Sequence, residues 1–249
     1  MVAAKPKLKN LCKFLDWDSE HFNKRIAQVK SSLLYQDDFK KVDHWCITNN
    51  IDCVYYLKDL SNSTESDIEE SNNFRLVDTR VEFKLKIENL PTEQQFDREI
   101  KVFSLGHHIN NELLMISDKN INNTRFYNDN KFDSDLVKKM YRIWIKKSCE
   151  DPSTTVLTAE YKNKIVGFIT FSHGYEGIST IGLVAIDKNY QRLGIGKSIM
   201  NECIHLSFKQ KKPRISVATQ LNNQPAIKFY ERFGFIVLRK SNWYHKWYT

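Results

Sequence analysis

Two hydrophobic periodicities alternate along the first ninety residues, and together they predict a small α/β unit. Alternating apolar and polar residues over 25–34 and 74–87, with the apolar run 52–57, predict three strands. Apolar residues at helical spacing predict a helix over 37–50, and the polar, acidic segment 61–73 carries the capping-box spacing that starts another. The expected order is strand, helix, strand, helix, strand.

A polar stretch with a proline at 88–95 predicts a linker, after which the periodicity resumes. Six further strands are expected, at 101–105, 155–161, 165–173, 179–186, 214–219 and 235–248. Helices are expected at 110–117, 135–150, 196–210 and 224–234. The short segment KNK between the second and third of these strands predicts a hairpin. We therefore expect two α/β domains, one over residues 1–90 and one over residues 91–249.

Composition and charge exclude several classes of protein. The 249 residues are 41% hydrophobic, which is enough for a substantial core. No apolar run approaches the roughly 20 residues that span a bilayer, so we expect no membrane association. The lysines of the N-terminus have no apolar segment behind them, so no signal peptide is expected. Five scattered cysteines without a CxxC pair and seven histidines without ligand spacing predict reduced thiols, a cytoplasmic protein and no metal site.

The formal net charge of +8 fits a phosphorylated small ligand or simply a soluble surface. The basic residues are spread along the chain, and no nucleic-acid-binding motif accompanies them, so we do not expect a nucleic-acid partner.

The most informative segment is QRLGIGKS, residues 191–198, between a predicted strand and a predicted helix. Its glycines let the backbone approach an anion closely, and a helix N-terminus offers unpaired N–H groups with partial positive charge. Arg192 and Lys197 add charge, which suits a diphosphate. A glycine turn that merely joins strand to helix is the alternative interpretation.

Two common nucleotide-binding motifs do not fit this segment. The phosphate loop GxxxxGK[ST] requires a glycine where the chain has Gln191. The dinucleotide fingerprint GxGxxG requires a third glycine where the chain has Ile199. The pattern that does fit is [QR]xxGxG.

This pattern carries a family resemblance. The segments LVAIDKNYQRLGIGKSIM (183–200) and NNQPAIKFYERFGF (222–235) resemble the GNAT superfamily of N-acetyltransferases. The resemblance implies an α/β GNAT fold, in which helices flank a mixed central sheet, with a smaller degenerate GNAT-like unit as the N-terminal domain. It also implies acetyl-coenzyme A as co-substrate.

The resemblance implies where the cofactor binds. The glycine loop holds its pyrophosphate, and the preceding strand splays from its neighbour so that free backbone groups pair with pantetheine. A backbone N–H of that strand can stabilise the oxyanion. The cofactor-binding residues that the family motif implies are Val184, Ala185, Ile186, Gln191, Arg192, Leu193, Gly194, Ile195, Gly196, Lys197, Ser198 and Asn223.

Tyr230 matches the family tyrosine that protonates the leaving thiolate. A thiolate leaves more easily if a phenol of pKa about 10 gives it a proton or a hydrogen bond. Outside this motif, an aromatic residue on a short helix is more often part of a core. Its neighbours Phe229 and Phe233 keep that interpretation.

A closer resemblance concerns the acceptor. Residues 14–29, 74–83, 124–148 and 217–248 are similar to the dTDP-fucosamine acetyltransferases, which acetylate the 4-amino group of a dTDP-linked 4-amino-4,6-dideoxyhexose for surface glycans. By this resemblance the partner is a dTDP-amino sugar. Substrate-binding candidates in the polar loop 120–135 are Arg125 for the diphosphate and Phe126 and Tyr127 for the sugar or base. A loop tethered by an arginine salt bridge is an equal alternative.

One position departs from the motif. Asn23 stands where we expect glycine after DWDSEHF (16–22), and asparagine tolerates left-handed backbone better than most residues. For DWDSEHF itself we favour a turn in which Asp or Ser caps a helix.

The mechanism that these residues favour is direct attack of a deprotonated amine on the thioester, because no Ser–His–Asp or Cys–His set predicts an acyl-enzyme. No general base is identified, and bulk water is a sufficient proton acceptor. The alternatives are another amine acceptor (a protein N-terminus, a polyamine or an antibiotic) and an inactive module that binds coenzyme A. The aromatic end of the chain, Trp243 to Tyr248, belongs either to a homodimer interface or to the core.

Overall fold

The computed structural model describes residues 11–62, 68–88, 99–106, 108–174 and 177–248. Its strands are β1 (Cys12–Phe14), β2 (Ile26–Val29), β3 (Cys53–Asp59), β4 (Arg75–Lys86), β5 (Ile100–Ser104), β6 (Thr154–Tyr161), β7 (Lys164–His173), β8 (Ile178–Ile186), β9 (Arg214–Gln220) and β10 (Ile236–Trp247). They form one mixed sheet in the order β1-β2-β3-β10-β4-β9-β8-β7-β6-β5.

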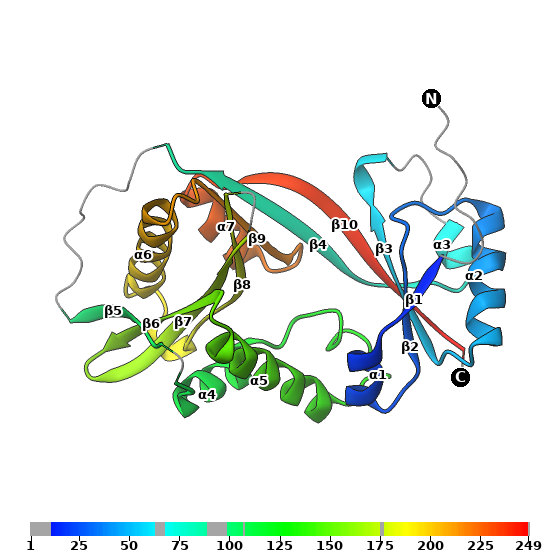
Figure 1. Ribbon diagram of the computed structural model, residues 1–249, viewed down its shortest axis with the longest axis horizontal. Coiled ribbons are helices and arrows are strands. Elements are labelled where there is room, and N and C mark those ends of the chain that lie inside the picture. Colours follow the sequence, from blue (N-terminus) through cyan, green and yellow to red (C-terminus); the bar gives the residue numbers. More distant parts are fainter. Residues whose placement is uncertain (1–10, 63–67, 89–98, 107, 175–176, 249) are drawn as a thin grey trace.

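Helices cover both faces of this sheet. They are α1 (Asp16–Phe22), α2 (Gln36–Thr48), α3 (Ile68–Ser71), α4 (Asn111–Asn120), α5 (Ser134–Glu150), α6 (Ile195–Lys209) and α7 (Gln224–Arg232), with single 3-10 turns at Leu60–Asn62 and Lys188–Tyr190. In the C-terminal half, α6 and α7 lie on one side of the strands and α4 and α5 on the other (Figure 1). In the N-terminal half, α2 is the main covering helix.

The chain uses one arrangement twice. The N-terminal half runs β2-α2-β3-α3-β4, and the C-terminal half runs β8-α6-β9-α7-β10. In each half the first two strands are parallel, β2 with β3 and β8 with β9, so each helix between them makes a βαβ crossover. The N-terminal half is thus a smaller version of the C-terminal half, as the predicted fold class requires.

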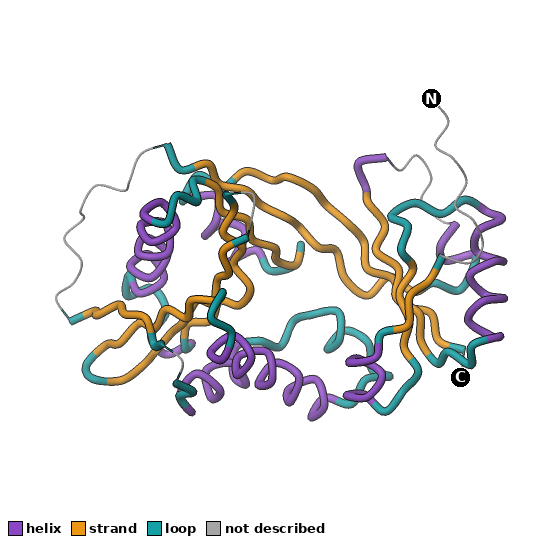
Figure 2. Tube along the Cα trace, in the orientation of Figure 1, coloured by secondary structure: helices purple, strands orange, loops and turns teal. Residues whose placement is uncertain are grey.

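The two halves exchange their last strands. β10, at the C-terminus, pairs with β3 along 241–247, and β4, from the N-terminal half, pairs with β9 along 80–86. β4 and β10 also pair with each other, so they form a continuous bridge between the halves (Figures 1 and 2). Each half therefore completes its sheet with a strand that the other half supplies.

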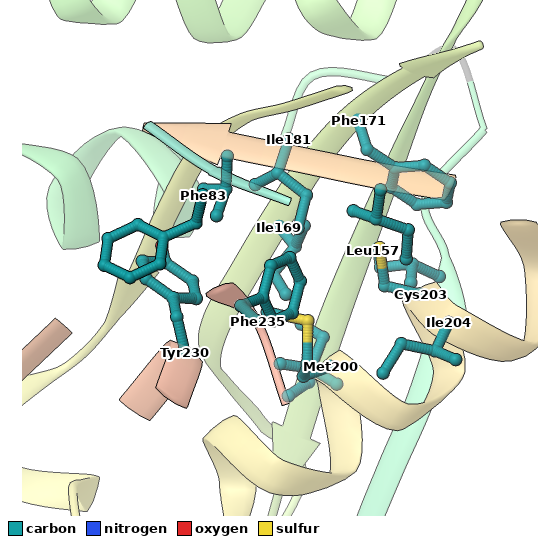
Figure 3. Close-up of a cluster of buried hydrophobic side chains, with 14 of the residues drawn as sticks. Phe83, Leu157, Ile169, Phe171, Ile181, Met200, Cys203, Ile204, Tyr230 and Phe235 are labelled. Atoms are coloured by element: carbon teal, nitrogen blue, oxygen red, sulfur yellow. The ribbon is translucent and has the colours of Figure 1, made fainter. Parts of the chain in front are cut away.

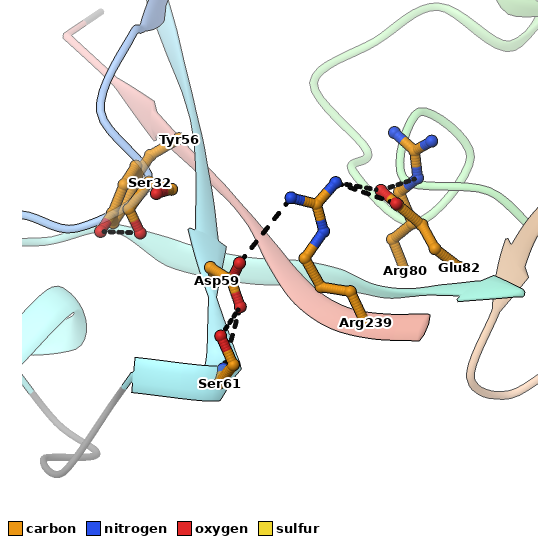
Figure 4. A network of polar contacts seen from close by, with 7 residues as sticks. All are labelled: Ser32, Tyr56, Asp59, Ser61, Arg80, Glu82 and Arg239. Atoms are coloured by element: carbon orange, nitrogen blue, oxygen red, sulfur yellow. Dashed lines mark hydrogen bonds and ion pairs between the residues drawn. The ribbon is translucent and has the colours of Figure 1, made fainter. Parts of the chain in front are cut away.

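Side chains on the bridging strands add polar contacts across the exchange. Arg239 of β10 donates from Nη2 to both carboxylate oxygens of Glu82 on β4, each at 2.9 Å (Figure 4). Its other terminal nitrogen lies 3.8 Å from Asp59 at the end of β3, and Arg80 approaches Glu82 at 3.4 Å. Because Arg239 is exposed to solvent, this network aligns the three strands more than it stabilises them.

Separate hydrophobic cores support the two halves, with an aromatic cluster between them. One core lies beneath α6 and α7, a second lies between α2 and the N-terminal strands, and a smaller one lies under α4. The aromatic cluster joins α1, α5, the loop 121–133 and strands β3 and β10 around Phe22, Tyr55 and Phe126. It is the part of the core that holds the two halves together on the α5 side.

Most predicted elements are confirmed, and the local chemistry explains why. The hairpin between β6 and β7 turns at Lys162 and Asn163, both of which have positive φ, as a tight two-residue hairpin turn requires. Pro225 stands in the first turn of α7, and Gly234, with φ 81°, follows its end. The predicted capping-box residues of segment 61–73 and most of the linker 88–95 lie outside the described residues.

The structure corrects several details. The strand expected over 25–34 ends at Val29, and β1 was not predicted. Segment 16–22 is a short helix rather than a turn, and no side chain caps it; Ser19 instead accepts a hydrogen bond from the Ile26 N–H, 2.9 Å away. Phe208, near the end of the predicted helix 196–210, is exposed, because it lies beyond the buried stripe of α6.

The aromatic final strand lies inside the sheet, between β3 and β4. The ring of Tyr244 stacks near Tyr56, and Tyr248 donates to Asp43 at 2.7 Å. The core interpretation of this segment therefore holds, and a homodimer stays a prediction. The division at residue 90 also stays a prediction, since the sheet runs continuously through both halves.

Candidate active site

The glycine loop leaves the end of β8 and opens helix α6. Gln191 donates from Nε2 to the carbonyl of Ile186, 3.1 Å away, which ties the loop to its strand. Arg192 (φ 66°) and Gly194 (φ 84°) both adopt left-handed backbone, and Gly194 is the residue from which α6 starts. The first N–H groups of a helix have no partner within it, and here no side chain caps them. The loop therefore presents N–H groups with partial positive charge.

The second glycine is needed for packing. A Cβ atom at Gly196 would lie 3.2 Å from the ring of Phe229 on α7. A side chain there would require the ring of Phe229 to shift. The two glycines thus have different structural roles: Gly194 adopts the left-handed backbone conformation, and Gly196 lets α6 and α7 approach each other.

The predicted cofactor-binding side chains of the loop divide into two groups. Arg192, Leu193 and Lys197 are exposed and can reach a ligand through their side chains. Ile195 is buried in the core, and Ser198 is buried with its hydroxyl 3.3 Å from the carbonyl of Gly194, to which it donates. Ile195 and Ser198 therefore face the protein, and only their backbone is placed to serve an anion.

The strands beside the loop separate where the sequence predicts it. The β8–β9 ladder ends at the pair Ile181–Val217, although β8 stays paired with β7 as far as Ile186. A β-bulge occurs at that point, and the Leu183 N–H donates to the Thr170 hydroxyl at 3.0 Å instead of to a backbone carbonyl. The bulge bends β8 away from β9. Within these described strands, residues 182–186 thus have no ladder on their β9 side.

The two flanks of this opening have different surroundings. Val184 and Ile186 pack on the core beneath α6, whereas Leu183 and Ala185 pack on the α4 and α5 side. Gly182 leaves room for the Thr170 hydroxyl at the bulge, because a Cβ atom there would lie only 3.0 Å from it. Neither Thr170 nor Gly182 was singled out from the sequence; only a mid-strand glycine signalled the bulge.

Tyr230 lies on the inner face of α7. Its side chain is 4% exposed and packs against the ring of Phe229. Figure 3 shows its contacts with the rings of Phe83 and Phe235. Burial raises the pKa of Tyr230 well above that of a free phenol. The phenol therefore stays protonated at neutral pH and can act only as a hydrogen-bond or proton donor to an anion.

Asn223 begins α7, and its side chain accepts a hydrogen bond from the Ala226 N–H at 3.3 Å. In this structure the residue is an N-cap, which accounts for its identity without a ligand. A contact with the cofactor arm through its amide nitrogen stays a prediction.

Arg125 is held by rings and by a histidine. Its guanidinium carbon lies 4.1 to 4.2 Å from the ring centres of Tyr55, Phe126 and Trp243. Its Nη1 donates to Nε2 of His245 at 3.0 Å. The structure therefore shows cation–π stacking and a histidine contact where the sequence suggested an ion pair.

This contact fixes the state of His245. Because Arg125 donates to Nε2, that nitrogen carries the lone pair, and Nδ1 carries the proton that it donates to Asp129 at 2.7 Å. Burial lowers the pKa of His245 to about 4, against the opposing effect of the hydrogen bond to Asp129. Burial acts to raise the pKa of Asp129, but hydrogen bonds from His245 and Trp247 outweigh it and the pKa falls. The array Asp129–His245–Arg125 thus presents one fixed cation.

The neighbours of Arg125 include a buried and a partly buried carboxyl group that the sequence did not reveal. Burial raises the pKa of Asp78 on β4 to about 6, although backbone N–H groups of Thr79 and Arg125 act to lower it. Burial also raises the pKa of Asp18 on α1, with Arg125 acting to lower it. Asp78 and Asp18 were hidden because their partners come from remote parts of the chain.

The other two acceptor candidates differ in exposure. Phe126 is 3% exposed and belongs to the aromatic cluster, whereas the partly exposed Tyr127 stacks on Tyr141. The buried hydroxyl groups of Tyr55 and Thr124 lie beside Arg125, where Tyr55 interacts with the carboxyl group of Asp18 and Thr124 with the phenol of Tyr141.

Asn23 confirms the expected backbone: its φ is 49° and its ψ is 46°, in the left-handed region. The turn after α1 therefore forms with asparagine in place of glycine.

Further sites are limited. No group of three or more His, Cys, Asp or Glu side chains in the described ranges could hold a metal ion. None of the described helices is long and apolar enough to cross a membrane.

A family comparison matches the part of the chain that contains this geometry. Residues 120–235 match the model of the Acetyltransferase (GNAT) family. The spore coat polysaccharide biosynthesis protein SpsD of Bacillus subtilis is 23% identical over 125 residues, which are 50% of this chain and 43% of SpsD. N-alpha-acetyltransferase 50 of Danio rerio is 37% identical over 71 residues, 28% of this chain and 40% of that protein. The matches thus cover less than half of these relatives.

Solved structures resemble nearly the whole chain. A GCN5-related N-acetyltransferase from Sphaerobacter thermophilus superposes with a TM-score of 0.69 at 12% identity, covering 95% of this chain and 76% of the other. A tandem GNAT protein from the clavulanic acid biosynthesis pathway gives a TM-score of 0.59 at 9% identity, covering 89% and 75%. At these identities the likeness concerns the fold. The chain is therefore an α/β protein of GNAT fold, and its residues 120–235 match the acetyltransferase (GNAT) family model.

Proposed function

We propose that this protein transfers an acetyl group from acetyl-coenzyme A to the 4-amino group of a dTDP-linked 4-amino-4,6-dideoxyhexose. The observation that carries the proposal is the uncapped start of α6 beside the point where β8 leaves β9. That arrangement offers an anion site and a row of strand backbone groups in one place, as a ligand with a diphosphate and an amide-containing arm requires.

The cofactor contacts follow from the geometry. The N–H groups around Gly194 and Gly196 bind the diphosphate, and the exposed Arg192 and Lys197 add charge. The two amides of pantetheine pair with β8 between Gly182 and Ile186, in the manner of an added strand. These contacts place the thioester near the bulge.

The chemistry is a single displacement. The neutral amine attacks the thioester carbon, a C–N bond forms, and the C–S bond breaks. A backbone N–H of β8 stabilises the oxyanion, and Tyr230 gives its proton to the leaving sulfur. The amine releases its proton to water, and the phenol regains one from solvent.

The acceptor is proposed to bind on the α5 side, near the aromatic cluster. Arg125, fixed by His245, would face the diphosphate of the ligand. Of the predicted aromatic contacts, Tyr127 is the one with exposed ring surface. The name of the relative SpsD, which refers to spore coat polysaccharide biosynthesis, supports a sugar acceptor in surface-glycan synthesis.

A second acceptor class is a protein N-terminus. The similarity to N-alpha-acetyltransferases 50 and 30 supports it, but it spans only 66 to 71 residues of this chain. SpsD matches 125 residues. A polyamine or antibiotic acceptor and an inactive coenzyme A-binding module have no comparable support in the described site.

The proposal is tested by following thiol release from acetyl-coenzyme A with a panel of acceptors. The panel contains dTDP-linked 4-amino-4,6-dideoxyhexoses, the same sugars without the nucleotide, N-terminal peptides and polyamines. We expect release only with the nucleotide-linked sugars, and mass spectrometry should find one acetyl group on the 4-amino nitrogen. Release confined to peptides or polyamines would overturn the acceptor assignment.

A further inference from the structure

Thr170 is a polar residue at a position where the fold would accept an apolar one. It lies on β7 between Ile169 and Phe171, and all three residues are almost completely buried. Burying a hydroxyl group costs free energy unless it makes a hydrogen bond, whereas a valine side chain has nearly the same shape and carries no such cost. The hydroxyl of Thr170 makes its hydrogen bond with the Leu183 N–H of β8, 3.0 Å away. That bond therefore explains why a threonine stands here.

The same hydroxyl occupies the space inside the β-bulge. A Cβ atom at Gly182 would lie 3.0 Å from the Thr170 hydroxyl but 3.9 Å from the Thr170 carbonyl oxygen. The hydroxyl thus fills the place that a side chain at Gly182 would take, and it bonds to the next residue of the bulge. Without it, the Leu183 N–H would lose its acceptor unless β8 moved so that a backbone carbonyl of β7 replaced it, as in a regular ladder. Thr170 therefore holds β8 in its bulged form.

The direction of the N–H groups of β8 depends on this bulge. The Leu183 N–H points to β7, and so does the Asp187 N–H, which donates to the carbonyl of Val166 at 2.8 Å. Successive N–H groups of a strand point to opposite sides, so the Val184 and Ile186 N–H groups point to the side where β9 has separated. Val184 is the first of these two after the bulge. A displacement of Leu183 would therefore displace the Val184 N–H as well.

We propose that Thr170 is a positioning residue for the acetyl transfer. Its hydroxyl holds the Leu183 N–H on the β7 side, and this fixes the Val184 N–H in the opening, where it donates to the thioester oxygen as negative charge develops there. The inference rests on the proposed function, since it takes the opening beside β8 as the place of the thioester. It adds that a buried hydroxyl of a neighbouring strand, acting through the backbone of β8, controls the rate of the reaction.

Kinetics of three variants test this role. Thr170→Val removes the hydroxyl and keeps the branched shape, so kcat should fall about 10- to 100-fold, somewhat less than the loss that follows outright removal of an oxyanion donor. The KM for acetyl-coenzyme A should stay within about 3-fold, because the glycine loop is unchanged. Thr170→Ser keeps the hydroxyl and should retain kcat within about 3-fold. Thr158→Val is the matched control: the hydroxyl of this buried threonine on β6 donates to the Phe103 carbonyl, away from the bulge, and its loss should leave kcat unchanged.

An amide NMR measurement gives a second test that needs no turnover. Spectra of the ¹⁵N-labelled protein are compared at saturating coenzyme A and at saturating acetyl-coenzyme A. The Val184 signal of the unaltered protein should differ between the two ligands, because only the second carries the thioester oxygen. The difference should be lost in Thr170→Val and kept in Thr170→Ser. The comparison in the unaltered protein is decisive even if Thr170→Val does not fold.

Three outcomes overturn the inference while the proposed function stands. They are an unchanged kcat in folded Thr170→Val, a loss in Thr170→Ser as large as that in Thr170→Val, and a Val184 signal that is the same with both ligands. The kinetics use the acceptor that the unaltered protein acetylates, so the identity of the acceptor does not affect this test. Absence of any shift with either ligand would overturn the proposed function and this inference together. Matching thermal unfolding curves show that folded proteins are compared.

Discussion

Helices α2 and α6 occupy equivalent places in the two halves, yet their first turns have opposite character. Each follows a strand and leads into a parallel one. α2 starts with Asp37 and Asp38, and the carboxylate of Asp38 accepts a hydrogen bond from the Tyr35 N–H at 3.2 Å. α6 starts at Gly194 with no acidic residue and with Lys197 in its first turn. The first turn of α2 thus carries carboxylates of the protein itself, whereas the first turn of α6 is free of them and can bind an anionic ligand.

A second pair of elements differs in the same way. After β9 comes α7 with Tyr230, a buried phenol with its proton available. After β3 comes α3 with Glu69, which is fully buried and forms an ion pair with Lys58 at 2.8 Å. The shared fold is therefore not sufficient for the candidate site. The site depends on the particular residues of α6 and α7 in the C-terminal half.

The largest expected effect concerns the exchanged strands. A chain that starts at residue 91 lacks β4, which pairs with both β9 and β10. We expect this fragment to be insoluble or unfolded, because the exposed edges of β9 and β10 would aggregate. Co-expression of residues 1–90 and 91–249 should restore a soluble complex. Circular dichroism and gel filtration measure the result, and a well-folded, monomeric fragment would contradict the exchange.

Substitution of Tyr230 tests the second difference between the halves. Tyr230→Phe keeps the ring packing but removes the proton donor, so kcat should fall about 100-fold while the affinity for coenzyme A stays within about 2-fold. Steady-state kinetics and calorimetry separate the two quantities. The matched change Tyr244→Phe, at a buried tyrosine outside the site, should leave kcat unchanged. Loss of cofactor affinity with unchanged kcat would contradict the acid role.

The cluster between the halves should make stability depend on pH. His245 has a folded-state pKa of about 4, below the value of about 6.5 expected in the unfolded chain. The unfolded state therefore binds more protons between these values, and stability is lost as the pH falls. The free energy of unfolding should drop by about 2 kcal/mol from this group between pH 7.5 and pH 5. Urea unfolding of the protein and of His245→Gln measures it; an equal drop in both would rule out His245 as the cause.

The smallest effect tests the helix starts directly. Lys197→Glu gives α6 an acidic first turn like that of α2, and the affinity for coenzyme A should fall about 10-fold. Asp37→Lys makes the reverse change at the exposed start of α2 and should leave that affinity unchanged. Calorimetry on the two variants gives the comparison. A comparable loss in Asp37→Lys would show that the cofactor contacts the N-terminal half.

The sequence alone predicted nearly all strands and helices, because their periodicities are local. It also located the glycine loop, where two glycines and flanking cations lie within eight residues. The exchange of β4 and β10 could not be predicted from the sequence. The alternating apolar and polar residues of each strand would fit equally well if the strand paired within its own half. The contacts of Arg125 were missed for a related reason: His245 is 120 residues away, and its neutral state depends on burial and on the nearby arginine charge, which the sequence does not show.

The sequence did not predict some small elements, and each has a separate physical reason. β1 has three residues, too few for a periodicity to be visible. α1 has no side-chain cap, so its polar residues indicated a turn, whereas it is held through Ser19 and β2. The bulge at Gly182 was hidden because a glycine in a strand is compatible with several distortions.

The central claim is that only the C-terminal half binds the acyl carrier, through the start of α6 and the unpaired side of β8. Amide NMR spectra of the ¹⁵N-labelled protein, recorded as coenzyme A is added, test it most directly. The account predicts saturable shifts at residues 182–186 and 192–198, with residues 30–39 at the start of α2 unmoved. Shifts confined to the N-terminal half, or none at all at millimolar cofactor, would contradict it.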